Sequence, residues 1–262
     1  MSPLPQRIDR VLLKKRADYF FATPKRRRKE LLDFSACLLN LGPTVAIGGF
    51  LRDLCLGGLW RFQSDVDFVV DPLSMPEFER FVESQSGKLN KFGGFSIALK
   101  HWKVDVWPLE RTWAGVSGHV NIVTLDDLLK ATFFDWDAIL YSILDQSLIS
   151  ESDYFERLQS RVIDVNLEPN PNPLGNAVRA LRYACRWEAR IGERLAIHVA
   201  RQVRDRGWAT LVASEKQSFR NPILGTVDGD HISQLLAGHE ATGGGPLTLF
   251  DHVQPELPLP VI

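Results

Sequence analysis

The chain has 262 residues, of which 45% are hydrophobic and 24% are charged, and its formal net charge at pH 7 is −1. This length allows one large domain or two small ones with a buried core, and the composition is typical of a globular protein. No window approaches the roughly 18 consecutive apolar residues of a membrane span, and the N-terminus lacks the apolar stretch of a secretion signal. The three cysteines are odd in number and widely spaced, which argues against a disulfide framework or cysteine metal site and favours the cytoplasm.

The N-terminal segment is strongly basic and is expected to form helices of the first domain. A helix is predicted over residues 24–40, with Thr23 as its cap and Pro24 at its first position. This basic cluster and a second one, over residues 179–206, indicate a local anionic partner on an otherwise neutral protein, although solvated helix faces are the alternative. RNA is the predicted partner in the first cluster, bound by Lys25, Arg26, Arg27 and Arg28.

A strand, a glycine turn and a helix follow in succession. The β-branched run 44–47 predicts the strand, and residues 50–56 predict the helix. Between them lie Gly48 and Gly49, which allow close backbone approach, while the free amides at a helix N-terminus attract anions. This element is therefore a candidate site for phosphate.

Two charged residues in the first turn of that helix extend the candidate phosphate site. Arg52 is placed to reach a phosphate oxygen. Asp53 either orients Arg52 or binds the nucleotide. Both are predicted, with the two glycines, as nucleotide-binding residues.

The next strand carries a pair of carboxylates. Residues 64–70 alternate so that Asp65 and Asp67 project from one face and the apolar side chains from the other. Two carboxylates this close repel each other unless a cation lies between them, and such hard ligands suit magnesium. Asp105, in the predicted strand 104–107, would add a third ligand and lie nearest the attacking hydroxyl. These three residues are predicted to be catalytic and to hold two Mg²⁺ ions, with Mn²⁺ as the alternative.

The remaining pattern divides the chain into three parts. A helix over 76–84 and strands over 95–99 and 104–107 complete a first half of mixed α/β character, and the pattern is mainly helical from residue 125. We predict an α+β fold made of a head, a neck and a tail. The head, residues 1–124, has a small mixed β-sheet flanked by helices; the neck, residues 125–228, is all-helical; and the tail, residues 229–262, is flexible and rich in Gly and Pro.

Two stretches of the head resemble a known family. Residues 46–57 and 64–70 are similar to the head of class II tRNA nucleotidyltransferases, the CCA-adding enzymes and bacterial poly(A) polymerases of the DNA polymerase beta superfamily. Their pattern is G-G-x-x-R-D-x-x-x-G followed by D-x-D on a strand. Residues 104–111 look like the family's third-carboxylate strand, and residues 172–186 resemble its neck segment.

The resemblance implies a function and roles for individual residues. It implies that Gly48, Gly49 and Arg52 hold the triphosphate, and that Asp65 and Asp67 hold the metals. The implied reaction transfers a nucleoside monophosphate from an NTP to an acceptor hydroxyl and releases pyrophosphate. The expected acceptor is the 3′ end of a tRNA-like RNA.

A row of arginines follows in the predicted neck. Arg179, Arg182, Arg186 and Arg190 recur at spacings of three, four and four, which places them on one helix face. Such a row can bind a base, a triphosphate or an RNA backbone, whereas the alternative is a solvated face paired with nearby glutamates. We predict nucleotide binding for Arg179, which the resemblance makes a base reader, and for Arg182, and RNA binding for Arg186 and Arg190.

Two other functions stay open. Gly175 and Asn176 stand where the family has its base-reading Glu-Asp pair, and residues 130–133 lack its R-R-D segment, which favours a catalytically retired module that binds RNA or nucleotide. The family's tRNA-gripping domains are largely absent after Arg206, which leaves open the transfer to a protein or small molecule. The sequence determines neither the NTP nor the oligomeric state.

Overall fold

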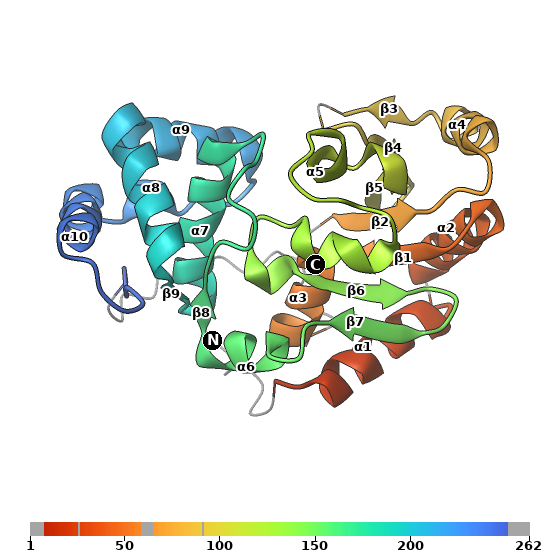
Figure 1. Ribbon diagram of the computed structural model, residues 1–262, viewed down its shortest axis with the longest axis horizontal. Coiled ribbons are helices and arrows are strands. Elements are labelled where there is room, and N and C mark those ends of the chain that lie inside the picture. The colour runs from red at the N-terminus through yellow and green to blue at the C-terminus, as the bar shows by residue number, and fades with distance from the viewer. Residues whose placement is uncertain (1–7, 26, 59–64, 91, 251–262) are drawn as a thin grey trace. The chain divides into compact units, whose positions relative to one another are not determined.

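The computed structural model of the chain describes residues 8–25, 27–58, 65–90 and 92–250 (Figure 1). The chain forms two compact units, Met1–Glu156 and Arg157–Ile262. Within the described ranges, no helix is both long enough and apolar enough to cross a membrane.

The first unit is built on a seven-stranded sheet whose strand order is β3-β4-β5-β2-β1-β6-β7. Neighbouring strands are antiparallel except β2 and β5, which are parallel. The sheet is therefore mixed, as predicted. Its strands are β1 (Thr44–Ile47), β2 (Val66–Val70), β3 (Lys88–Leu89), β4 (Phe95–Ala98), β5 (Lys103–Pro108), β6 (Ile139–Ser142) and β7 (Ser147–Ser150).

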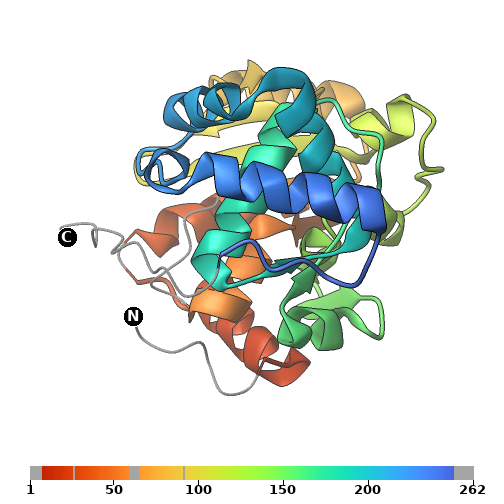
Figure 2. The ribbon, with the colours of Figure 1, turned by 90° about the vertical axis from the view of Figure 1, so that its left-hand side faces the viewer.

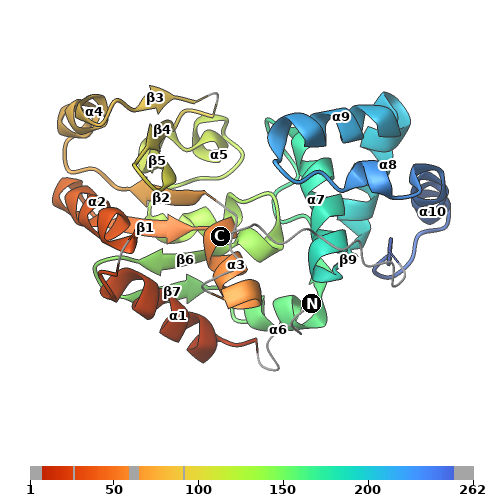
Figure 3. The same cartoon turned by 180° about the vertical axis from the view of Figure 1, so that it is seen from behind.

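Three helices lie over one face of this sheet (Figure 3). They are α1 (Arg10–Ala22), α2 (Arg28–Leu41) and α3 (Gly49–Gly57). Phe68 of β2 is fully buried against this layer, where its ring meets those of Phe21 and Phe34. The helix predicted over residues 24–40 starts later than expected, because Thr23 ends α1 instead of capping α2.

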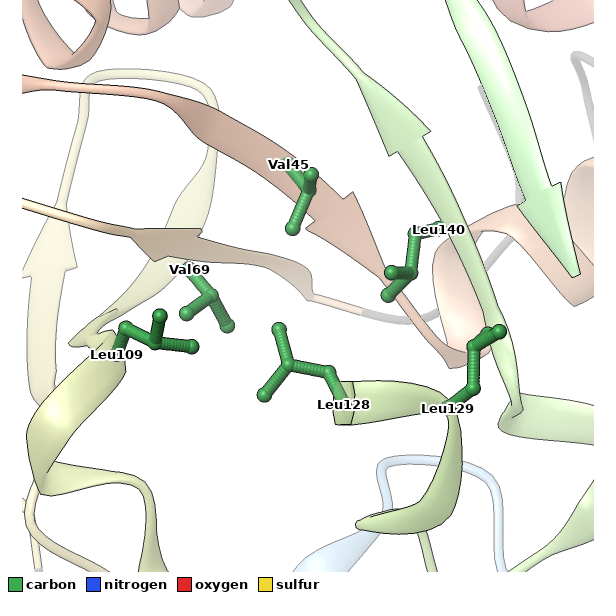
Figure 4. Close-up of a cluster of buried hydrophobic side chains, with 6 residues drawn as sticks. All are labelled: Val45, Val69, Leu109, Leu128, Leu129 and Leu140. Atoms are coloured by element: carbon green, nitrogen blue, oxygen red, sulfur yellow. The ribbon is translucent and has the colours of Figure 1, made fainter. Parts of the chain in front are cut away.

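Short elements cover the opposite face. Val45, Val69 and Leu140 point from the strands toward three leucines of these elements, and the six side chains form a buried cluster (Figure 4). Leu109 comes from η2 (Leu109–Arg111), and Leu128 and Leu129 come from η3 (Leu125–Lys130). The remaining elements of the first unit are α4 (Met75–Ser84), whose Phe81 ring lies beside Phe34 of α2, and α5 (Trp113–Val116), η4 (Asp135–Asp137) and α6 (Tyr154–Ser160).

The first unit extends well past the predicted boundary at residue 124. Strands β6 and β7 lie in the stretch that was expected to be helical, and they add to the sheet beside β1. All four residues of β6 are buried, so this strand has no polar side to reveal a period of two. A short apolar run of this kind cannot be distinguished from a helix by periodicity.

The second unit consists mainly of helices. They are α7 (Pro173–Trp187), α8 (Glu193–Arg206), α9 (Trp208–Ser218), η5 (Leu224–Thr226) and α10 (Gly229–Thr242), and α10 lies alongside α8 (Figure 2). The unit is not all-helical, because β8 (Val162–Ile163) and β9 (Arg190–Ile191) form a small parallel sheet.

The predicted flexible tail also differs from the structure over its described part. Residues from Gly229 to Thr242 form α10, whose first amides are capped by the side chain of Asp228. Leu247 then pairs with Ile191, and Leu249 is buried. Residues 251–262 lie outside the described part.

Candidate active site

Asp67 and Asp105 lie directly opposite each other on neighbouring strands. They are Cα partners in the parallel pairing of β2 with β5, so their side chains share one face of the sheet. That face is the one that also carries Val69, while Val66 and Phe68 are buried on the other. The expectation of a third carboxylate on a strand adjoining the first two is confirmed. Asp65 immediately precedes β2.

The glycine turn lies at the same end of the sheet. Ile47, the last residue of β1, is the Cα partner of Asp67, so the end of β1 lies beside the start of β2. Gly48 follows with φ 79° and ψ −135°, a conformation that strongly favours glycine. Gly49 begins α3, so the amides of its first turn, which carry partial positive charge, lie at the end of the sheet where β2 begins.

Lys103 is a site residue that sequence reasoning missed. Its Nζ donates to Asp65 Oδ2 at 2.5 Å. The hydrogen bond to Asp65 is the largest cause of a raised pKa of Lys103; burial opposes it, and the charges of Asp65, Asp105 and Asp67 add to the rise. The signal was available, since Lys103 lies two residues before Asp105 and so shares its face of the strand.

Asp105 has a protein donor on its other side. Ser96 of β4 is its Cα partner in the antiparallel pairing with β5, and the Ser96 hydroxyl donates to Asp105 Oδ1. Asp65 is thus turned to Lys103 and Asp105 to Ser96. Across the described ranges, no three His, Cys, Asp or Glu side chains converge closely enough to form a metal-binding group.

Arg52 lies beneath the turn and not at the surface. Its side chain is 3% exposed, and its Nε and Nη2 donate to Asp53 Oδ1 at 3.0 and 2.9 Å. Its Nη1 donates to Asp137. Of the two roles predicted for Asp53, the structure contains the one that orients Arg52. Because only 3% of its side chain is exposed, Arg52 would have to move toward the surface to contact a phosphate directly.

Asp137 is the second residue that the sequence did not reveal. It ends η4, just before β6, and lies 85 positions from its partner Arg52. A Cβ on Gly48 would lie 3.9 Å from the Cβ and from the carbonyl oxygen of Asp137, so this residue lies beside the glycine turn. Asp137 therefore connects the turn, α3 and the start of β6.

The predicted arginine row is interrupted in the second unit. Helix α7 ends at Trp187 because Glu188 adopts a left-handed conformation, with φ 51°. Arg190 lies beyond this break, in β9, so the prediction that it continues the helix face is wrong. The other three arginines are on α7.

Arg182 is held in an internal ion pair. It donates to Glu215, whose side chain is fully buried, and to the carbonyl of Asn221 at 3.0 Å. Its guanidinium also lies 4.0 Å from the ring centre of Phe219. These contacts give Arg182 a packing role. Glu215 accepts in addition the backbone amides of Ile223 and Leu224.

The other predicted RNA and nucleotide contacts have local partners of their own. Arg179 donates to the buried Asn176, and the Arg186 guanidinium lies 4.5 Å from the ring centre of Trp187. These contacts neither require nor exclude a ligand, so both roles stay predictions.

The N-terminal basic cluster is only partly exposed. Lys25 and Arg27 are exposed, and the carbonyl of Arg27 accepts the indole of Trp102. Arg28 lies over the ring of Tyr19, at 4.6 Å from its centre. Arg26 lies outside the described residues. RNA binding here stays a prediction.

Comparison with known proteins connects this arrangement to a fold. No protein-family model matches the chain, and no curated protein matches it in sequence. Among the solved structures similar to it is the Thermotoga maritima CCA-adding enzyme complexed with tRNA, with 21% identity and a TM-score of 0.50 over 74% of this chain and 46% of that one. Another is a CCA-adding enzyme in complex with ATP, with 19% identity and a TM-score of 0.52 over 86% of this chain and 53% of that one.

The chain thus spans about half the length of these two proteins. The likeness confirms the predicted α+β class, and the chain shares the fold of the CCA-adding enzymes over the aligned part.

Proposed function

We propose that the chain is a nucleotidyltransferase that moves a nucleoside monophosphate from an NTP to a hydroxyl at the 3′ end of a tRNA-like RNA and releases pyrophosphate. One observation carries the proposal. Asp67 and Asp105 are paired across the inner strands β2 and β5, with Asp65 adjacent, near the end of these strands where Gly48 and Gly49 open α3.

The three carboxylates fit a divalent ion in the chemistry of their donor atoms, although they do not yet converge on one point, because Asp65 accepts from Lys103 and Asp105 from Ser96. They supply only hard oxygen donors, the type that magnesium prefers. The cation already drawn to them, the Lys103 ammonium, indicates a local potential that favours positive charge. Asp65, Asp67 and Asp105 would hold two Mg²⁺ ions, with Mn²⁺ as the alternative. When bound, the ions would lower the pKa of the attacking hydroxyl and stabilise the departing pyrophosphate.

The chain's own residues would position the two substrates. The first-turn amides of α3 would bind the triphosphate, and Asp53 and Asp137 would fix Arg52 and hence the start of that helix. Asp105 would lie nearest the attacking hydroxyl and would accept its proton. From the sequence we retain Arg179 as a proposed nucleotide ligand, and Arg186, Arg190 and the N-terminal cluster as proposed RNA contacts. The ion pair of Arg182 with Glu215 accounts for Arg182 without a ligand.

The substrate classes come from the proteins that share the fold. One was solved with tRNA and the other with ATP, so we propose RNA and NTP partners for this chain. The three free cysteines agree with the reducing cytoplasm as the place of the reaction.

Transfer can be tested with NTPs labelled at the α-phosphate. Full-length protein is incubated with each NTP, Mg²⁺ and total cellular RNA, and label is sought at RNA 3′ ends. We expect label with the wild type and its loss with Asp67→Asn and Asp105→Asn. The matched control is Asp33→Asn, an exposed aspartate of α2 that pairs with Lys29. Label that persists in Asp67→Asn, or that is absent from every fraction, would contradict the proposal.

A retired binding module is the second candidate. The observation that favours it is the presence of Gly175 and Asn176 where the similar enzymes read the base. This candidate predicts no transfer with any NTP, together with RNA or nucleotide binding that Asp67→Asn leaves intact. Label in protein or in small molecules, and not in RNA, would instead identify a different acceptor.

A further inference from the structure

Lys103 brings a positive charge of the chain itself to the carboxylates. It is the first residue of β5, and alternation along the strand places its side chain on the face that carries Asp105. Its Nζ donates to Asp65 Oδ2 at 2.5 Å. The register of β5 with β2 explains this partner, because the next pair along the two strands is Val104 with Val66.

This ion pair contributes little to the stability of the fold. The side chains of Lys103 and Asp65 are 56% and 43% exposed, and exposed pairs of this kind are worth only a small fraction of a protein's stability. The ammonium is therefore free to exchange its partner at low cost. Its main effect is on the charge of the site, where it offsets part of the repulsion among the carboxylates.

We propose that Lys103 is an internal competitor for the metal: its ammonium holds Asp65 until a divalent ion displaces it, and Lys103 thereby sets the metal affinity. The inference rests on the proposed function, since it takes Asp65, Asp67 and Asp105 as the metal ligands. A divalent ion at these carboxylates has to replace the Nζ contact to Asp65 and then lies close to the displaced positive charge. Both effects weaken binding, and both disappear when the charge is removed.

Mn²⁺ binding measures this competition directly. Mn²⁺ is titrated into the full-length wild type, Lys103→Met and Lys103→Arg without nucleotide. The concentration of free Mn²⁺ is measured by electron paramagnetic resonance at each step. We expect Lys103→Met to bind Mn²⁺ roughly 3- to 10-fold more tightly, as expected for removing one charge a few ångström from a divalent ion in a solvated site. Lys103→Arg keeps the charge and should stay within about 2-fold of the wild type.

The matched control is Lys29→Met. Lys29 also pairs with an aspartate, Asp33 at 2.6 Å, but on α2. It should leave Mn²⁺ binding unchanged, and thermal melting should show that each variant is folded. Equal Mn²⁺ affinity in Lys103→Met and the wild type, or an equal gain in Lys29→Met, would overturn the inference.

The same titration distinguishes a protein that lacks the metal site from one in which Lys103 has no effect on metal affinity. If the wild type binds Mn²⁺ and Asp67→Asn does not, the metal site stands, and only the comparison of Lys103→Met with the wild type decides the role of Lys103. If the wild type does not bind, or Asp67→Asn binds as well as the wild type, the metal site is absent. That result overturns both this inference and the proposed function.

Discussion

Asp67 and Asp105 face each other as Cα partners on the parallel pair of strands in an otherwise antiparallel sheet. A parallel register keeps both side chains on one face, and the strands on either side hold the pair in place. Ile47 pairs with Asp67 from β1, and Ser96 pairs with Asp105 from β4. Asp67 and Asp105 thus lie within inner strands of the sheet and not in a loop.

Asp105 and its hydrogen-bond donor are expected to differ in importance. Asp105→Asn removes a charged ligand and should lower the rate of transfer about 100-fold or more. Ser96→Ala removes only the hydroxyl that orients Asp105, so we expect a loss of about 10-fold or less. Single-turnover rates with labelled NTP measure both. A larger loss with Ser96→Ala than with Asp105→Asn would show that Asp105 is not a ligand.

Asp137 should stabilise the first unit through Arg52. The guanidinium of Arg52 is buried between Asp53 and Asp137, so Asp137→Asn leaves Asp53 as its charged partner in these two ion pairs. The substitution should lower the free energy of unfolding by about 1–3 kcal/mol. Urea unfolding measures this value. Asp33→Asn, which breaks an exposed pair, should cost about 1 kcal/mol or less. Equal losses in the two variants would mean that the buried contact contributes no more to the free energy of unfolding than the exposed pair does.

Glu215 should be among the most sensitive positions of the second unit. It is fully buried and accepts from Arg182 and from two backbone amides, so Glu215→Ala should cost about 3–5 kcal/mol in urea unfolding. Asp205→Ala, in an exposed pair with Arg204, is the control and should cost about 1 kcal/mol or less.

Arg182→Ala distinguishes the packing role from ligand binding. It should destabilise the second unit because it leaves the Glu215 carboxylate buried without its cation. Unchanged stability together with weaker nucleotide binding would support the role that the sequence predicts.

His198 should make the second unit less stable in mild acid. Burial lowers the pKa of His198 below its ordinary value of 6.5, although its hydrogen bond to the Pro173 carbonyl opposes this effect. Below pH 6.5 the unfolded chain takes up a proton that the folded chain resists. Stability should therefore be full above this pH and decline as the pH falls toward the lower folded pKa. The melting temperature should depend less on pH in His198→Gln than in the wild type. His231→Gln, which replaces an exposed histidine, should keep the pH dependence of the wild type.

The cysteines should report on folding through their reactivity. Burial raises the pKa of Cys55 to about 12, whereas Cys37 is exposed. At about pH 8 only about one Cys55 thiol in 10⁴ is ionised, and it is also inaccessible, so alkylation should mark Cys37 first. Mass spectrometry of the labelled peptides follows the order, and Cys55 should react only in denaturant. Early labelling of Cys55 in buffer would contradict the packing of α3.

The sequence by itself determined the local features of the site. Alternation along a strand is a property of neighbouring residues, so the shared face of Asp65 and Asp67 could be read directly. The turn at Gly48 is also a local feature, because the residue type itself indicates the unusual backbone conformation. The valines on either side of Asp105, together with the family resemblance, predicted it as the third carboxylate of the site.

Only the tertiary structure decided which distant segments meet. The contact of Arg52 with Asp137 spans 85 positions, and that of Lys103 with Asp65 depends on the register of two strands. Strand partners are selected by packing across the whole unit, which no local pattern records. The break at Glu188, which takes Arg190 off the helix, likewise arises where the chain turns into β9 and pairs with β8.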